Sequence, residues 1–332
     1  MLGAAAKLGL ALAGVALFAL VSLSVGPGEI SLAESSAWLF GGEGRDGVEA
    51  ILGSLRLPRI VLTLLVGGSL GCAGALTQGL FRNPLASPSV LGLPTGAATA
   101  VVAGFAFGLD AQALWVTPLL AFVGAFVMLL LLFALSAGTR DATTLLLSGV
   151  ALGALMGAIT TCLLAFRLEQ WDLARRSLAW MMGSFDGRGW SHLRWAGPPM
   201  AVGMLVAFTL YRGLDLLYLG EDAAGSLGLD PLRMRQATAA VVALLVGAAT
   251  AAAGAIVFVG LIVPHIVRPL VGPGHGPLLA GSIIGGGALV LAIDTVSRAL
   301  APMSIAPGAL SALIGGSFFL LLLRRQRVGG EA

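Results

Sequence analysis

The residues that could carry chemistry in this chain are few and widely separated. The three histidines, His192, His265 and His275, show no HExxH motif or other metal-ligand spacing. Lys7 is the only lysine, so the phosphate-binding loop of ATP-hydrolysing enzymes, which ends in Gly-Lys-Ser/Thr, is absent. The sequence therefore predicts no catalytic residues, no metal site and no cofactor bound by this chain.

One acidic residue lies in the middle of a long apolar run. Acidic residues inside membrane spans often mark the ion pathway of an ion-coupled carrier, and Asp294 is the candidate here. Arg298 follows four residues later, so the two side chains can instead pair along one helix face. Both interpretations fit this spacing.

A short polar stretch, residues 219–230, separates two long apolar halves. It begins with the acids Glu221 and Asp222, which suit the positive end of a helix dipole, and Gly228 suits the residue just past a helix end. We expect a two-turn helix outside the bilayer whose small residues let a partner protein approach, with Leu227 filling a pocket. A solvated loop between two spans also fits the local sequence.

The amino-acid composition indicates which kind of secondary structure positions these residues. Of 332 residues, 58% are hydrophobic and only 11% are charged, and apolar runs of about 20 residues recur along the chain. An all-α polytopic membrane protein is the expectation. The net charge of +3 does not indicate nucleic-acid binding. Cys72 and Cys162 both lie in apolar runs and are expected to be small buried hydrophobic residues without a disulfide.

About ten transmembrane helices are predicted. The first is read as a retained span and not as a cleaved signal peptide. The segment with Pro264, His265 and Arg268 is short for a crossing. The predicted spans are approximately 8–25, 60–81, 90–109, 113–136, 144–166, 196–212, 236–257, 258–271, 277–299 and 307–323.

The polar segments suggest how the chain is oriented. Residues 167–194 carry three tryptophans, which is typical of a segment lying along a membrane surface. In the ten-span topology, the side with both termini and residues 219–230 has more basic than acidic residues, and the other side is balanced. Both termini are therefore expected in the cytoplasm.

An internal repeat supports a transporter. Residues 64–67 and 244–247 both read LLVG, and residues 73–75 and 253–255 both read AGA, with Pro84 and Pro264 following at the same spacing. An odd number of crossings separates the copies, so they would form inverted repeats over about 56–166 and 233–323 in one membrane domain, residues 1–332.

The fifth predicted span has a glycine stripe on one face, formed by Gly149, Gly153 and Gly157. Such a stripe indicates close helix packing or the wall of a pathway. Thr143 and Thr144, at the start of this span, are candidates for a gate or for helix caps.

Five segments in this order resemble the FecCD family, the membrane permeases of bacterial ABC importers for iron-siderophores, haem and cobalamin. They are residues 56–93, 180–190 (WMMGSFDGRGW), 219–230 (LGEDAAGSLGLD), 254–272 and 305–325. The resemblance spans nearly the whole chain from Arg56 to Arg325. It implies a type II ABC importer permease fold, a homodimer around a central pathway, two cytoplasmic ATPases that bind ATP and Mg, and a periplasmic binding protein.

The resemblance also assigns roles to individual residues. The family's coupling helix, at about 220–229, falls on Glu221, Asp222, Ala223, Ala224, Ser226, Leu227 and Gly228. Basic residues that face acidic residues of the docked binding protein fall on Arg56, Arg59 and Arg298, although arginines anchored in the membrane interface would occupy the same places. The inner gate and adjoining pathway fall on Ala142, Thr143, Thr144, Ser148, Gly149, Gly153 and Gly157.

The cargo is the least determined part of this prediction. Arg175 and Arg176, followed by Met181 and Met182, offer cations and thioethers for the propionates and iron of haem. An amphipathic helix lying in the membrane interface would show the same pattern. Haem or another iron chelate is the preferred cargo, with cobalamin as the alternative and an ion-coupled secondary transporter as the alternative class.

Overall fold

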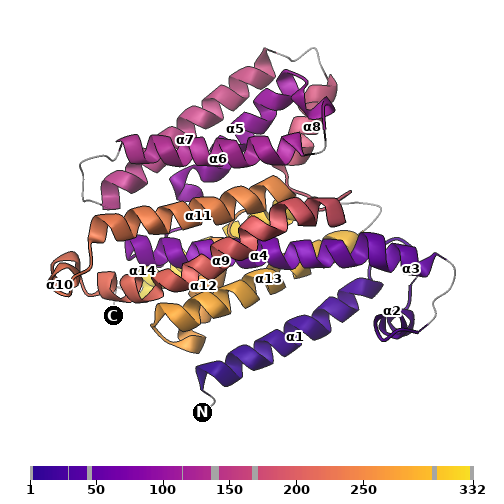
Figure 1. The fold of residues 1–332 in the computed structure, drawn as a ribbon, viewed down its shortest axis with the longest axis horizontal. Coiled ribbons are helices and arrows are strands. Elements are labelled where there is room, and N and C mark those ends of the chain that lie inside the picture. The colour runs from indigo at the N-terminus through magenta and orange to yellow at the C-terminus, as the bar shows by residue number, and fades with distance from the viewer. Residues whose placement is uncertain are drawn as a thin grey trace.

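The computed structural model describes residues 3–28, 30–42, 47–113, 115–135, 142–166, 171–300 and 305–329, and within them it leaves out the side chains of residues 90, 142, 143, 323 and 325–329. All regular elements in the described part of the chain are helices, which confirms the all-α prediction (Figure 1). The long helices are α1 (Ala4–Ser24), α4 (Leu57–Phe81), α6 (Val116–Leu135), α7 (Ala142–Ala165), α9 (Trp190–Tyr218), α11 (Pro231–Ala253), α13 (His275–Ala299) and α14 (Pro307–Gly329).

The remaining elements are short. They are α2 (Leu32–Leu39), α3 (Val48–Ala50), the π-helical turn η1 (Ile51–Arg56), the 3-10 turns η2 (Pro88–Leu91) and η3 (Leu109–Ala111), α5 (Leu93–Ala106), α8 (Trp171–Met181), α10 (Glu221–Ser226) and α12 (Val259–Val271).

The apolar helices agree with the predicted spans. In the described part of the chain, seven helices are long and apolar enough to cross a membrane, and α5, α12 and the apolar part of α14 are shorter apolar helices. Each of these ten helices falls on one of the ten predicted spans. At 1.5 Å per residue, the 13 residues of α12 reach roughly 20 Å, less than the ~30 Å hydrocarbon core. The irregular backbone at 254–258 that precedes α12 is buried or half-buried, which suits irregular backbone close to membrane spans.

Helix α4 is the centre of the bundle and packs against α9, α11, α12 and α13. Its crossing with α13 requires glycine, because a Cβ on Gly67 would lie 2.1 Å from the carbonyl oxygen of Gly286 and one on Gly71 would lie 2.1 Å from that of Ser282. Small residues let the two backbones come into direct contact. Burial of apolar side chains gives no driving force for helix association in lipid, so this close van der Waals packing stabilises the helix pair.

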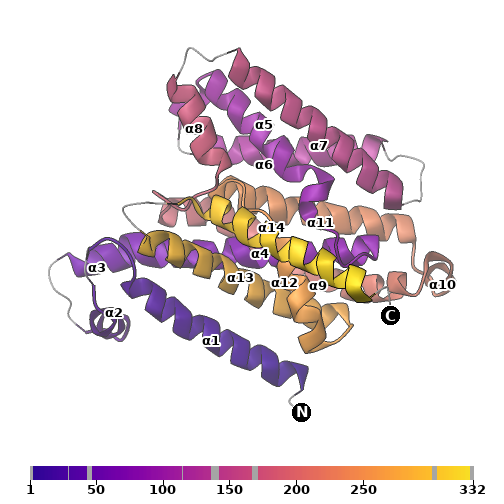
Figure 2. The same ribbon diagram turned by 180° about the vertical axis from the view of Figure 1, so that it is seen from behind.

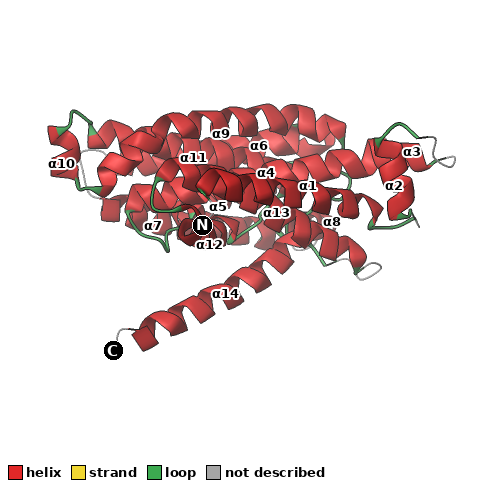
Figure 3. Cartoon of the chain, turned by 90° about the horizontal axis from the view of Figure 1, so that it is seen from below, coloured by secondary structure: helices red, strands yellow, loops and turns green. Residues whose placement is uncertain are grey.

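Helices α5, α6 and α7 form a second layer joined to the core mainly through α11 (Figure 2). Helix α14 diverges from the bundle and packs only along part of its length, against α12 and α13 (Figure 3). Many large apolar side chains on α6, α7 and α14 are exposed in the single chain. These surfaces are suited to lipid or to another apolar protein surface.

The two ends of the bundle differ. Helix α10 lies at one end, α2 and α3 lie at the other, and both termini are in the half that carries α10 (Figure 1). The repeated letters fall mostly within α4 and α11, which pack against each other. The division into inverted repeats remains a prediction.

Cys72 is buried in α4 as expected, but Cys162 is exposed on α7, so the sequence-based prediction of burial was wrong for that residue. Cys162 lies on a face of α7 that the described residues do not cover.

Candidate functional site

The polar stretch between the apolar halves forms the short helix α10, as predicted, although its six residues make less than two turns. Gly228 has φ +84° just beyond the helix, in the left-handed region that glycine adopts without strain. Glu221 holds the start of the helix to the core: its carboxylate pairs with Arg235 of α11, which is 8% exposed, and lies 3.8 Å from Arg82 at the end of α4. This ion pair attaches α10 to two core helices.

The faces of α10 differ from the sequence-based expectation at one position. Ala224 is fully buried against the core, so its side chain cannot contact a partner protein. Leu227 is 63% exposed and Leu219, before the helix, is 66% exposed; the other exposed residues of the stretch are Asp222, Ala223, Gly225, Ser226, Gly228 and Asp230. The surface available for docking is therefore the outer face of α10, with Leu227 as its large apolar side chain.

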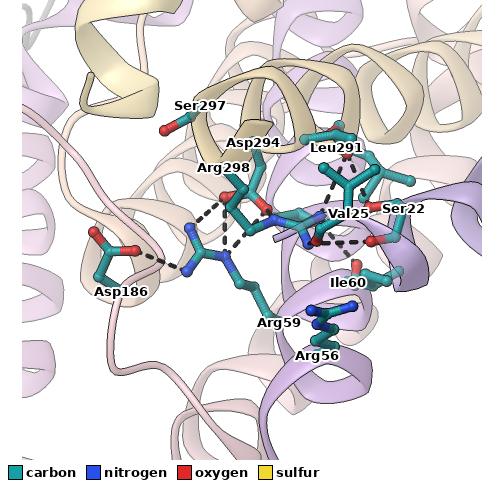
Figure 4. Close-up of polar contacts among 12 residues, drawn as sticks. Ser22, Val25, Arg56, Arg59, Ile60, Asp186, Leu291, Asp294, Ser297 and Arg298 are labelled. Carbon is teal, nitrogen blue, oxygen red and sulfur yellow. Dashed lines mark hydrogen bonds and ion pairs between the residues drawn. The ribbon is translucent and has the colours of Figure 1, made fainter. Parts of the chain in front are cut away.

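At the opposite end of the bundle, four charged residues from three segments form a charge cluster: Arg59, Asp186, Asp294 and Arg298 (Figure 4). Asp294 is fully buried and accepts hydrogen bonds from Arg59 Nε at 3.1 Å and Nη2 at 2.8 Å, and from Arg298 Nε at 3.0 Å. Asp294 thus pairs with Arg298 along one helix face, one of the two interpretations that the sequence left open. The second arginine, from α4, adds further hydrogen bonds to the buried carboxylate, and Asp186 balances its charge.

Two arginines hold the end of α1 in place. Arg56 donates to the carbonyl oxygens of Leu23 at 2.5 Å and of Pro27 at 2.9 Å. Arg298 donates to the hydroxyl of Ser22 and to the carbonyl oxygen of Val25 (Figure 4). Carbonyl groups at a helix C-terminus lack helical partners and favour cations. Arg56 and Arg298 therefore bind within their own chain.

Arg59 keeps one contact near solvent. Its Nη1 donates to Asp186 at 2.7 Å, and the Asp186 side chain is 70% exposed. Partial burial alone would raise the pKa of Asp186, but the hydrogen bond and charge of Arg59 outweigh it and hold that pKa below its usual value. Asp186 is therefore charged at neutral pH. A carboxylate from a partner would have to displace it to reach Arg59.

The predicted gate and pathway residues lie on α7. Thr144 and Ser148 are partly exposed, whereas the side chains of Ala142 and Thr143 lie outside the described part of the chain. The glycine stripe is divided: a Cβ on Gly153 would lie 3.5 Å from Gly92, and a Cβ on Gly92 would lie 2.9 Å from the carbonyl oxygen of Gly149. A Cβ on Gly157 would have nothing within 4 Å, so this part of the stripe faces open space. Close packing and an open surface thus occur on one helix face.

A cavity of about 560 Å³, here called the α8 cavity, lies between α5, α8 and the loop that follows α8. Its wall includes Phe105, Asp110, Arg176, Trp180, Met182, Asp186, Arg188 and Ile305. Of the four predicted cargo contacts, Arg176 and Met182 reach this cavity. Arg175 is exposed and is not part of the wall of this cavity, and Met181 packs among apolar residues next to Trp180.

Residues 14–325 match the FecCD transport family. The chain belongs to the FecCD transport family. This FecCD permease is 42% identical over 282 residues to the cobalamin import system permease protein BtuC of Halobacterium salinarum, covering 84% of this chain and 75% of that protein. It is 38% identical over 326 residues to the hemin transport system permease protein HmuU of Yersinia pestis, covering 95% of each chain.

The fold agrees with a solved member of the same class. A metal-chelate type ABC transporter in an inward-facing conformation superposes on the FecCD permease with a TM-score of 0.85 and 29% identity, covering 96% of this chain and 98% of the other. A multi-pass membrane permease of the ABC importer type is thus established for the chain as a whole.

Several residues of the FecCD permease that the sequence-based prediction missed lie in the α8 cavity. Arg188 and Trp180 belong to the WMMGSFDGRGW segment that carries the family resemblance, and Asp110 pairs with Arg176 across 66 positions at 2.6 Å. No sequence motif links Asp110 to Arg176, so that pair could not be predicted. Arg188 could have been singled out, because it is an arginine in a short Gly-rich loop that follows an amphipathic helix.

Proposed function

We propose that this FecCD permease is the membrane subunit of an ATP-driven importer that moves haem or another iron chelate from a periplasmic binding protein to the cytoplasm. The observation that carries the proposal is α10, a short helix outside the apolar core that is held by the Glu221–Arg235 pair and exposes Leu227. A separate ATPase would bind this surface, because the chain has no phosphate-binding loop.

The proposed orientation places α10 and both termini in the cytoplasm and the charge cluster at the periplasmic end. Two copies of the permease would form a homodimer, with the exposed apolar surfaces of α7 and α14 between the copies or against lipid. Each copy would receive one ATPase, and one binding protein would dock over the periplasmic end.

The mechanism is alternating access driven from outside the chain. Closure of the ATPases on ATP moves α10, and Arg235 and Arg82 pass the movement to α11 and α4. Because α4 meets α13 through backbone contact and α11 packs on α6, the core helices move as connected bodies. The permease performs no chemistry on its cargo.

Cobalamin is the second candidate cargo, since the Halobacterium relative named for cobalamin import is 42% identical. Reconstitution with the ATPase and binding protein, followed by uptake of haem, a ferric siderophore and cobalamin, tests the choice. ATP-dependent uptake of haem supports the proposal. Uptake of cobalamin alone overturns the cargo assignment, and uptake driven by an ion gradient without ATP overturns the class.

A further inference from the structure

The α8 cavity contains a positive charge that the described part of the chain does not neutralise. Arg176 pairs with Asp110 at 2.6 Å, and Asp186 is held by Arg59 at 2.7 Å. Arg188 has no side-chain hydrogen bond or ion pair among the described residues, and burial lowers its pKa. A partly buried guanidinium loses hydration, and without a partner no hydrogen bond or ion pair compensates for that loss. Binding of an anion next to Arg188 would therefore be favoured.

Two residues of the same wall also carry unused hydrogen-bond donors. The indole Nε1 of Trp180, a residue only 8% exposed, has no acceptor among the described residues, and neither does Nε of Arg188. Both atoms are N–H donors. Both atoms are shielded from solvent, so a group in the cavity would instead meet the terminal Nη1 and Nη2 donors of Arg188, which are not shielded.

The rest of the wall is apolar. Phe105, Met182 and Ile305 lie in the lining, and a volume of about 560 Å³ is in the range of pockets for small organic ligands. The Asp110–Arg176 pair lies beside Phe105, with the guanidinium 5.9 Å from the ring centroid. The cavity therefore combines one uncompensated cation with surfaces for an apolar body.

We propose that the α8 cavity binds a carboxylate arm of an amphipathic organic chelate, with Arg188 as the residue that pairs with the carboxylate. This inference rests on the proposed function, because the chelate is taken to be the transported cargo. It selects among the candidate cargoes: haem has two propionates, whereas the side chains of cobalamin end in amides. The cavity is distinct from the stretch of α7 that contains Gly157.

The test compares haem, haem dimethyl ester and cyanocobalamin on the complex of permease, ATPase and binding protein reconstituted in lipid nanodiscs. Equilibrium binding is followed by absorbance for the wild type, Arg188→Gln and the control Arg194→Gln, which changes an exposed arginine outside the cavity. We expect Arg188→Gln to weaken haem binding about tenfold or more, as for loss of one charge-assisted hydrogen bond. Ester binding should be unchanged by either substitution.

The outcomes separate this inference from the proposed function. If the wild type imports haem and its dimethyl ester equally with ATP, the importer assignment stands and the carboxylate site is refuted. Equal haem binding by Arg188→Gln and the wild type also refutes it. Loss of binding-protein association in Arg188→Gln, with haem binding retained, would make Arg188 a docking residue and overturn the inference.

Discussion

Arg59 of α4 and Asp294 of α13 form the buried centre of the charge cluster, with Arg59 Nη2 2.8 Å from Asp294 Oδ1 and the carboxylate fully shielded from solvent. These residues are 235 positions apart. The pair ties the two most extensively packed helices of the bundle together at the end opposite α10. It also gives the buried Asp294, near the C-terminal end of α13, two arginine partners within the chain.

Asp294→Asn should strongly destabilise the permease, because it leaves Arg59 and Arg298 buried without a carboxylate. Breaking one side of a buried ion pair typically costs about 3–5 kcal/mol of unfolding free energy. The loss is measured by chemical unfolding in detergent micelles. Asp172→Asn, an exposed carboxylate on α8, is the control and should change little. Equal stability of the two variants would contradict the structural role of Asp294.

Asp186→Asn tests whether Arg59 takes part in docking. If a partner carboxylate must displace Asp186, removing its charge should tighten association with the binding protein by up to about fivefold, the worth of an exposed ion pair. The gain should be larger at low ionic strength. Association is measured by surface plasmon resonance at two salt concentrations. Weaker or unchanged association would assign Arg59 to the internal cluster alone.

The pH dependence of that pair follows from the lowered pKa of Asp186. A depressed folded-state pKa means that the pair's contribution to stability is present above the unfolded value, about 3.9, and is lost as pH falls through the lower folded value. The difference between wild type and Asp186→Asn should therefore be constant from about pH 8 to pH 5. A difference that disappears above pH 5 would show that Asp186 is not held by Arg59.

Adding one methyl group at each of two glycines should have opposite effects on folding. Gly71→Ala places a Cβ about 2 Å from a backbone oxygen of α13, which cannot move without separating the helices, so folded protein should be nearly lost. Gly157→Ala meets nothing within 4 Å and should fold normally. For each variant, the monodispersity and the midpoint of thermal unfolding are measured in detergent. Normal folding of Gly71→Ala would contradict the backbone contact between α4 and α13.

The sequence predicted the helices well because membrane spans are set by local hydrophobicity. The predicted runs coincide with the seven long and three shorter apolar helices found among the described residues. Gly228 likewise marked the end of α10 through a local conformational preference. Both signals require only neighbouring residues and no knowledge of tertiary contacts.

The side-chain partners could not be predicted in the same way. Whether Ala224 faces the core or a partner depends on how α10 rotates against α9 and α11, which no residue of α10 specifies. The arginines at 56, 59 and 298 were identified as a group, but their partners come from the end of α1 and from the loop after α8. Those contacts appear only when distant segments are packed together.

The outer face of α10 offers the most direct test of coupling to an ATPase. Ala224→Trp would disturb packing, because Ala224 is buried, so the informative change is Leu227→Asp, with Phe40→Asp as a matched change of an exposed apolar residue at the opposite end. ATPase association and ATP-driven uptake are measured in proteoliposomes on folded protein. We expect at least a tenfold loss of ATPase association and of uptake for Leu227→Asp and neither loss for Phe40→Asp. Unchanged association and uptake in Leu227→Asp would contradict the assignment of α10 as the coupling surface.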